Sequence, residues 1–143
     1  ILVQEAVLRL HREGHVSVSE EKIPVHVQKE VEPRGHEIII RYMIKNLADK
    51  TIHSKFGSEW NFYQIPEEIA VSPNEVLLCG GRIHFEVFPE QEIWHFALQT
   101  LSQSERGYDI IHQGFCILPW WSVTLSGGEE FKAQIVLRDQ RGQ

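Results

Sequence analysis

Three stretches of the sequence concentrate side chains that could do chemistry. They are residues 57–62 (GSEWNF), residues 100–108 (TLSQSERGY) and residues 112–121 (HQGFCILPWW). Each combines aromatic rings with amides, carboxylates or other polar groups. Sugar sites use this mixture, because an aromatic face covers the apolar side of a pyranose ring and planar polar groups bond its hydroxyls. The stretches therefore predict a carbohydrate-binding or interface site, with these candidates: Glu59, Trp60, Asn61, Gln103, Glu105, Tyr108, Gln113, Trp120 and Trp121.

Structural roles compete with ligand contact at the same positions. Trp60, Trp94 and Trp120 could be core residues, since large aromatic side chains dominate sandwich interiors. Glu59, Gln103 and Glu105 could instead bond backbone groups in bends, because buried polar groups must find partners. The sequence leaves both roles open at each position.

The tryptophan pair at residues 120–121 allows a more specific expectation. Adjacent residues on a strand face opposite ways, so Trp120 and Trp121 cannot both enter the same core. Trp94 lies among the apolar residues of an alternating segment. We therefore expect Trp60 and Trp94 to be buried, and Trp121 to be more exposed than Trp120.

Catalysis by these residues has weaker support. Glu59 and Glu105 could form a carboxylate pair of the kind glycosidases use, and Glu105 with His112 could form an acid/base pair. Such combinations are common in any domain, so no residue is predicted to be catalytic. The eight histidines show no HxH, HExxH or Cys/His spacing, and no P-loop, GxSxG or GxGxxG motif occurs. Neither a metal site nor a cofactor is expected.

Alternating strands must position these stretches. Four segments place apolar side chains on one face and polar side chains on the other: residues 37–45, 82–88, 92–101 and 130–138. Runs of strand-forming residues predict further strands at residues 3–11, 23–31, 51–62, 75–78 and 110–118. Turn residues separate the segments, and residues 46–50 are expected to form a hairpin loop. Eight or nine half-buried strands predict an all-β, antiparallel β-sandwich.

Length and charge narrow the class of protein further. The 143 residues have the usual size of one domain, so residues 1–143 are expected to form a single sandwich. The net charge of −6 lacks the basic footprint that binds phosphate backbones, so a nucleic acid partner is not expected. No apolar run approaches the length of a membrane span, so no membrane partner is expected either.

The cysteines and the first residues suggest a setting for the chain. Cys79 and Cys116 are isolated in the sequence, and both are expected to be buried or half-buried thiols in a reducing compartment. This indicates a cytoplasmic location. The sequence opens on Ile1 without a signal-peptide pattern, which suggests a fragment of a larger protein.

The same stretches resemble a known domain family. The resemblance rests on YMIKN at residues 42–46, FGSEWNF at 56–62, WHF at 94–96, QTLSQSE at 99–105, GY at 107–108, and QG leading to LPW at 113–120. They are similar to the C-terminal domain of the α-amylase/4-α-glucanotransferase type in glycoside hydrolase family 57, over about Glu37 to Leu137. The resemblance implies a galactose-mutarotase-like supersandwich.

The resemblance also implies a role. In that family the catalytic carboxylates lie in a separate N-terminal barrel, whose motifs are not found here. The chain is therefore expected to be a non-catalytic accessory domain of an α-glucan-processing enzyme, with the barrel as partner and α-glucan as a candidate ligand. Two alternatives stay open. One is a purely structural module, and the other is a mutarotase-like or epimerase-like enzyme that would use Glu59 or Glu105 with a histidine.

Overall fold

The computed structural model describes residues 6–18, 20–63, 69–104 and 107–140, and this part of the chain contains strands but no helix. The strands are β1 (Leu8–Val18), β2 (Glu21–Arg34), β3 (Glu37–Asn46), β4 (Ile52–Gly57), β5 (Trp60–Phe62), β6 (Ala70–Ser72), β7 (Glu75–Leu78), β8 (Ile83–Phe88), β9 (Ile93–Ser104), β10 (Gly107–Leu125) and β11 (Glu130–Asp139). Accordingly, no helix of the described residues is long and apolar enough to cross a membrane.

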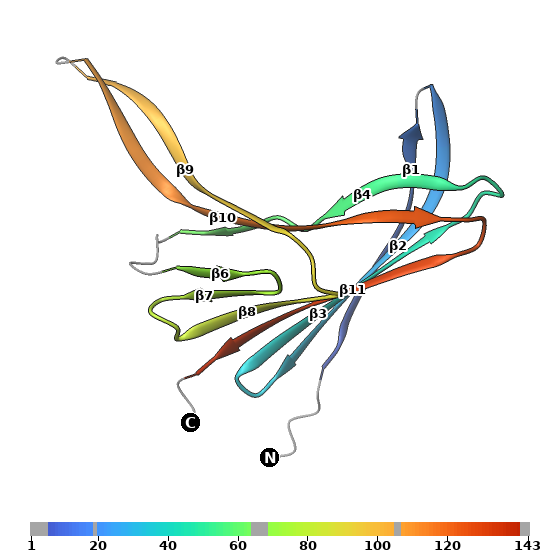
Figure 1. Ribbon diagram of the computed structural model, residues 1–143, viewed down its shortest axis with the longest axis horizontal. Coiled ribbons are helices and arrows are strands. Elements are labelled where there is room, and N and C mark those ends of the chain that lie inside the picture. The colour runs from blue at the N-terminus through green and yellow to red at the C-terminus, as the bar shows by residue number, and fades with distance from the viewer. Residues whose placement is uncertain (1–5, 19, 64–68, 105–106, 141–143) are drawn as a thin grey trace.

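The strands form two antiparallel sheets (Figure 1). The large sheet has the order β1-β2-β3-β11-β8-β7-β6. In the small sheet, β10 is central: β9 pairs with its residues 107–119, β5 with residues 115–117 and β4 with residues 120–125. Ile117 pairs with both β5 and β9, so these two strands flank β10 on opposite edges. The predicted all-β antiparallel sandwich is confirmed.

The core lies between the inner faces of the two sheets. Phe85, Val87 and Ile135 enter it from the large sheet, and Ile117 and Trp121 enter it from the small sheet. The apolar residues of β8 and β11 alternate as their sequences predict, because one face of each strand meets the core and the other meets water. The β9–β10 hairpin extends beyond this core, away from the rest of the molecule (Figure 1).

Two chain crossings join the sheets at one buried residue, Asn46. Its Nδ2 donates to the backbone oxygens of Lys50, Leu125 and Ser126 at 2.6, 3.0 and 3.2 Å, and its Oδ1 accepts from the backbone N–H of Ala48 at 3.0 Å. The prediction of a hairpin at residues 46–50 is therefore wrong. The segment leaves β3 in the large sheet and enters β4 in the small sheet, and Asn46 bonds to it and to the returning segment after β10.

Other strand boundaries also differ from the predictions. The structure describes eleven strands instead of eight or nine, partly because the expected strand at 51–62 is divided at residues 58–59 into β4 and β5. The first predicted strand, at 3–11, begins in the described residues only at Leu8 and continues to Val18, since β1 pairs along most of β2. The short strand β6 was not predicted. The prediction for β7, residues 75–78, matches its bounds.

Candidate functional site

The outer face of the small sheet carries an aromatic cluster. Directly paired residues of antiparallel strands share a face, and β9 and β10 pair Trp94 with Leu118 and Phe96 with Cys116. Trp120 lies two residues beyond Leu118 and so shares this face. Asn61 of β5 also pairs with Cys116 and lies on it too. We call the group formed by Glu59, Asn61, Trp94, Phe96 and Trp120 the outer aromatic face.

The rings of this face are fixed by contacts among neighbours. The Trp94 and Trp120 centroids lie 5.6 Å apart with their planes at 64°, an edge-to-face contact. The Lys55 ammonium lies 4.1 Å from the Trp120 ring centroid, a cation–π distance. Trp94 Nε1 donates to Glu92 Oε1 at 2.9 Å, and Asn61 Nδ2 donates to Glu59 Oε1 at 2.7 Å. The cluster is therefore ordered without any ligand.

Two features of the face are unusual for a surface that meets only water. Trp94 and Phe96 remain 48% and 47% exposed. The Trp120 indole N–H is buried and bonds to none of the described residues. An unpaired buried donor costs about 1–3 kcal/mol. Exposed aromatic rings gathered on one face are typical of a surface that another molecule covers.

The structure corrects the predicted tryptophan orientations. Trp121 is only 2% exposed, whereas Trp120 is half-buried on the opposite face. Trp121 stacks on Phe56 at 5.7 Å, and its indole N–H donates to the Pro89 backbone oxygen at 2.9 Å. The alternation of the pair was predicted correctly, but its direction was not, because nothing in the local sequence says which face of β10 meets the large sheet.

The same inversion applies to β9. The prediction that Trp94 is buried is wrong, because the inner positions of this strand are Ile93, His95 and Ala97, with His95 5.9 Å from the Phe115 ring. The more apolar set of β9 side chains therefore points outward. Trp60 is half-buried rather than buried, and lies edge-to-face against Phe85 at 5.4 Å.

The polar candidate residues are not brought together at one place. Glu59 and Asn61 lie on the outer aromatic face with Trp120, while Trp60 and Trp121 face the core. Gln103 and Tyr108 pair near the tip of the β9–β10 hairpin, and Gln113 Nε2 donates to Thr100 Oγ1 at 3.0 Å further along it. Glu105 lies outside the described residues. The eight described candidates are therefore distributed over the outer aromatic face, the core and the β9–β10 hairpin.

Exposed apolar side chains also mark the hairpin. Leu101 and Ile110 pair across it and are each 67% exposed, and Tyr108 is 69% exposed. Gly114 allows β10 to lie close to the end of β5 at the base of the hairpin: a Cβ atom there would lie 2.3 Å from the Phe62 backbone oxygen, beside the bulge between His112 and Gly114. The hairpin thus extends the exposed apolar surface beyond the outer aromatic face.

A second candidate site, not predicted from the sequence, lies on the outer face of the large sheet. Four strands place Glu30, Arg41, Gln134 and Phe88 in one row, because these residues pair successively across β2, β3, β11 and β8. A cavity of about 550 Å³ lies over this row. We call it the polar groove.

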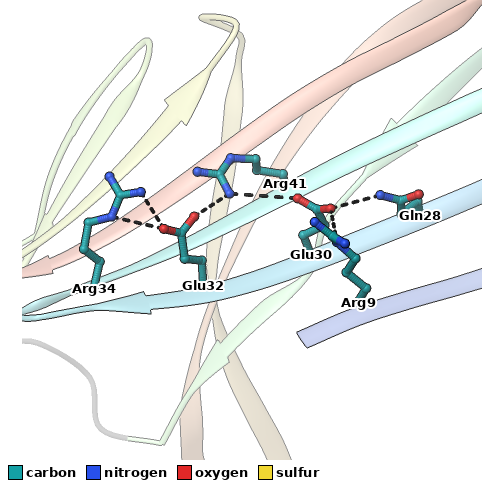
Figure 2. Close-up of polar contacts among 6 residues, drawn as sticks. All are labelled: Arg9, Gln28, Glu30, Glu32, Arg34 and Arg41. Atoms are coloured by element: carbon teal, nitrogen blue, oxygen red, sulfur yellow. Dashed lines mark hydrogen bonds and ion pairs between the residues drawn. The ribbon is translucent and has the colours of Figure 1, made fainter. Parts of the chain in front are cut away.

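Charged side chains hold one side of the polar groove in place (Figure 2). Arg41 lies between two carboxylates, with Nη1 2.6 Å from Glu32 Oε2 and 3.9 Å from Glu30 Oε2. Glu30 also accepts from Arg9 Nε at 2.8 Å and from Gln28 Nε2 at 3.1 Å. The hydrogen bonds that Arg41 and Arg34 donate lower the pKa of Glu32. A run of polar residues at every second position of β2, from residue 28 to 34, is the sequence signal for this network.

Two other observations concern titratable groups. Ligand atoms of Glu75, His84 and Glu86 all lie within 4.8 Å of one another, but His84 Nδ1 already bonds Glu75 at 2.6 Å and Arg138 bonds Glu86 at 2.9 Å. These three side chains therefore already have hydrogen-bond partners within the large sheet. Cys79 is exposed, contrary to prediction, since it lies in a turn with φ of 53°.

Comparison with known proteins identifies the domain. Residues 74–135 match the family described as Alpha-amylase/4-alpha-glucanotransferase, C-terminal. The 4-alpha-glucanotransferase of Thermococcus litoralis is 36% identical over 114 residues, which are 75% of this chain. The chain carries a C-terminal domain of this family. An alpha-amylase of Pyrococcus abyssi is 35% identical over 103 residues, 64% of this chain and 15% of the relative.

Solved structures agree with this identification. The crystal structure of the Thermococcus litoralis 4-alpha-glucanotransferase superposes on the domain with a TM-score of 0.72 and 28% identity, over 92% of this chain and 21% of that one. A proposed aldose 1-epimerase of Escherichia coli K12 has a TM-score of 0.55 at 14% identity, over 92% of this chain and 64% of that one, which shows a likeness of fold alone. This domain spans 17% of the length of the Thermococcus litoralis relative, and so corresponds to a small part of a much larger enzyme.

Proposed function

We propose that this chain is a non-catalytic accessory domain of an α-glucan-processing enzyme, and that it holds the catalytic part through the outer aromatic face and the β9–β10 hairpin. The single observation that carries the proposal is the inverted strand β9. Its larger apolar side chains, Trp94 and Phe96, point away from the sandwich core, although burying them would stabilise the fold. A strand of this kind gains that burial from a partner.

The comparisons support the catalytic part of such an enzyme as the occupant of the face. The matching relatives are enzymes named for alpha-amylase and 4-alpha-glucanotransferase activity, and the matched segment is about a sixth of their length. In such an enzyme most of the chain lies outside this domain and is available to cover the face. Aromatic residues at the centre with polar groups around them are the usual composition of interface hot spots.

The test uses the parent enzyme divided into this chain and its catalytic part. The two pieces are expected to elute together in size-exclusion chromatography, and a Trp94→Ala, Trp120→Ala double variant is expected to weaken their association at least about tenfold. Phe88→Ala is the matched control, since Phe88 is an exposed aromatic residue on the outer face of the large sheet. Association that is absent, or unchanged in the double variant, would contradict the proposal.

The proposal that this domain is non-catalytic has a separate test. The isolated chain is expected to release no reducing sugar from soluble starch. Release that disappears in a Glu59→Gln variant would show instead that this domain is itself a hydrolase.

A further inference from the structure

We propose that the polar groove on the outer face of the large sheet binds a neutral oligosaccharide, a short segment of α-glucan. The groove lies over β2, β3 and β11, and the Phe88–Pro89 segment at the end of β8 borders it. Its volume, about 550 Å³, lies within the range of small-ligand pockets. This inference rests on the proposed function for the chemistry of the glucan, but it concerns a different surface.

The groups that line the groove have the chemistry of a sugar site. The amides of Gln28 and Gln134, the carboxylate of Glu30 and the guanidinium of Arg41 are planar donors and acceptors suited to vicinal hydroxyls. Phe88 is 41% exposed at the border and offers an apolar ring to the face of a pyranose. Polar groups on the floor and an aromatic ring at the side are the combination with which protein sites hold a pyranose ring.

The charge of the groove favours an uncharged ligand. Its charged side chains are Glu30, Arg41, Glu130 and Lys132, two anions and two cations, so their formal charges cancel. A phosphate or a nucleic acid would need an excess of cations. A metal ion would need an excess of anions. A polyhydroxylated neutral chain fits the balance, because it both donates to carboxylates and accepts from cations.

The groove is also ordered before any ligand enters. Glu30 accepts hydrogen bonds from both Arg9 and Gln28, and Arg41 is bonded to Glu32 at 2.6 Å, as Figure 2 shows. Side chains fixed in this way lose little conformational entropy when they bind a ligand. The few contacts that one or two sugar rings can make nevertheless limit the affinity to the millimolar range.

The position of the groove allows it to act while the domain is docked. Each sheet turns its inner face to the common core, so the outer face of the large sheet and that of the small sheet lie on opposite sides of the sandwich. A catalytic part that covers Trp94 and Trp120 therefore leaves the groove open. In this arrangement the domain would hold a glucan chain on the side away from its docking surface.

The test is a titration of the chain with maltoheptaose, followed by amide chemical shifts in ¹H–¹⁵N NMR spectra. We expect saturating shifts at Gln28, Glu30, Arg41 and Gln134, with a dissociation constant in the millimolar range. Phe88→Ala is expected to weaken binding by at least about fivefold, since it removes the aromatic contact. Tyr63→Ala is the matched control and should bind maltoheptaose as the wild type does. Its spectrum and that of Phe88→Ala also confirm that each variant is folded.

The outcomes separate this inference from the proposed function. Shifts that are absent at the solubility limit of the sugar, or that cluster around Trp94 and Trp120, would overturn the inference. Binding that Phe88→Ala leaves unchanged would overturn it as well. None of these results bears on the docking of the catalytic part, which the Trp94→Ala, Trp120→Ala variant tests separately. That double variant should bind maltoheptaose normally.

Discussion

At the scale of single residues, Asn46 shows how one side chain can set the connection between sheets. It is fully buried and makes its bonds to segments that are about 80 positions away as well as to its own turn. The sequence alone does not reveal this role, because an Asn in a loop is an ordinary turn residue. Only the arrangement of β3, β4, β10 and β11 makes it a junction.

We expect Asn46→Ala to lower the free energy of unfolding by about 3 kcal/mol, since it leaves several buried backbone groups unpaired. The measurement is urea unfolding followed by circular dichroism. Leu47→Ala is the control, because Leu47 is exposed beside the junction, and it should change stability by less than about 1 kcal/mol. Equal effects of the two substitutions would show that Asn46 is not the junction described here.

Glu32 gives a pH-dependent prediction. Hydrogen bonds from Arg41 and then Arg34 lower its pKa in the folded state, so the carboxylate stabilises the fold above the ordinary glutamate pKa of about 4.3. That stabilisation is lost as the pH falls through the lowered pKa, because Glu32 is then protonated in both the folded and the unfolded state.

The Glu32→Gln variant is therefore expected to be less stable than the wild type at pH 7, and its stability should approach that of the wild type as the pH falls through the lowered pKa. Thermal unfolding at a series of pH values measures the difference. Glu21→Gln is the comparison, because its pair with Lys50 is exposed and should contribute little at any pH. A difference between wild type and Glu32→Gln that is constant with pH would count against the ion-pair explanation.

At the scale of the elements, the strands could be predicted and their orientation could not. Residues 82–88 and 130–138 alternate as half-buried strands do, and β8 and β11 confirm them. For β9, the same pattern gave the wrong face, because the alternation of Trp94, Phe96 and Leu98 identifies a face without saying what covers it. A partner outside the chain can cover an apolar face just as the core can.

The polar groove was missed for a related reason. Its residues lie on β2, β3, β8 and β11, and they meet only through strand pairing. Glu30 and Arg41 form no motif in sequence, and Phe88 lies far from both along the chain. The clusters that did stand out, such as residues 57–62, were divided between the two faces of the small sheet by the alternation of its strands.

The assignment of Trp121 to the core and of Trp94 to the outer face can be tested in the isolated chain. We expect Trp121→Ala to cost about 3–5 kcal/mol, because it removes a fully buried indole that packs on Phe56. Trp94→Ala should cost about 1 kcal/mol or less, since half of that side chain is already exposed. Chemical unfolding measures both values. If the two substitutions cost the same, the assignment of β10 faces is wrong.

At the scale of the whole molecule, the sandwich has two outer faces of different character. The face of the small sheet is aromatic and includes Trp120, whose indole N–H bonds to none of the described residues, whereas the face of the large sheet is a network of paired charges around the polar groove. This difference agrees with the two separate binding roles proposed for the two faces. One face is suited to a permanent protein interface, and the other is suited to a weakly held, hydrophilic ligand.

The central claim, that the outer aromatic face is covered by the catalytic part of a parent enzyme, is tested most directly by hydroxyl-radical footprinting. Side-chain oxidation at Trp94, Phe96 and Trp120 is measured by mass spectrometry in the isolated chain and in the parent enzyme, with Phe88 on the outer face of the large sheet as the exposed reference. We predict that oxidation of Trp94 and Phe96 falls at least about fivefold in the parent enzyme, because their exposed area is buried there, while Phe88 is oxidised equally in both. Equal oxidation of Trp94 and Phe96 in the two samples would contradict the claim.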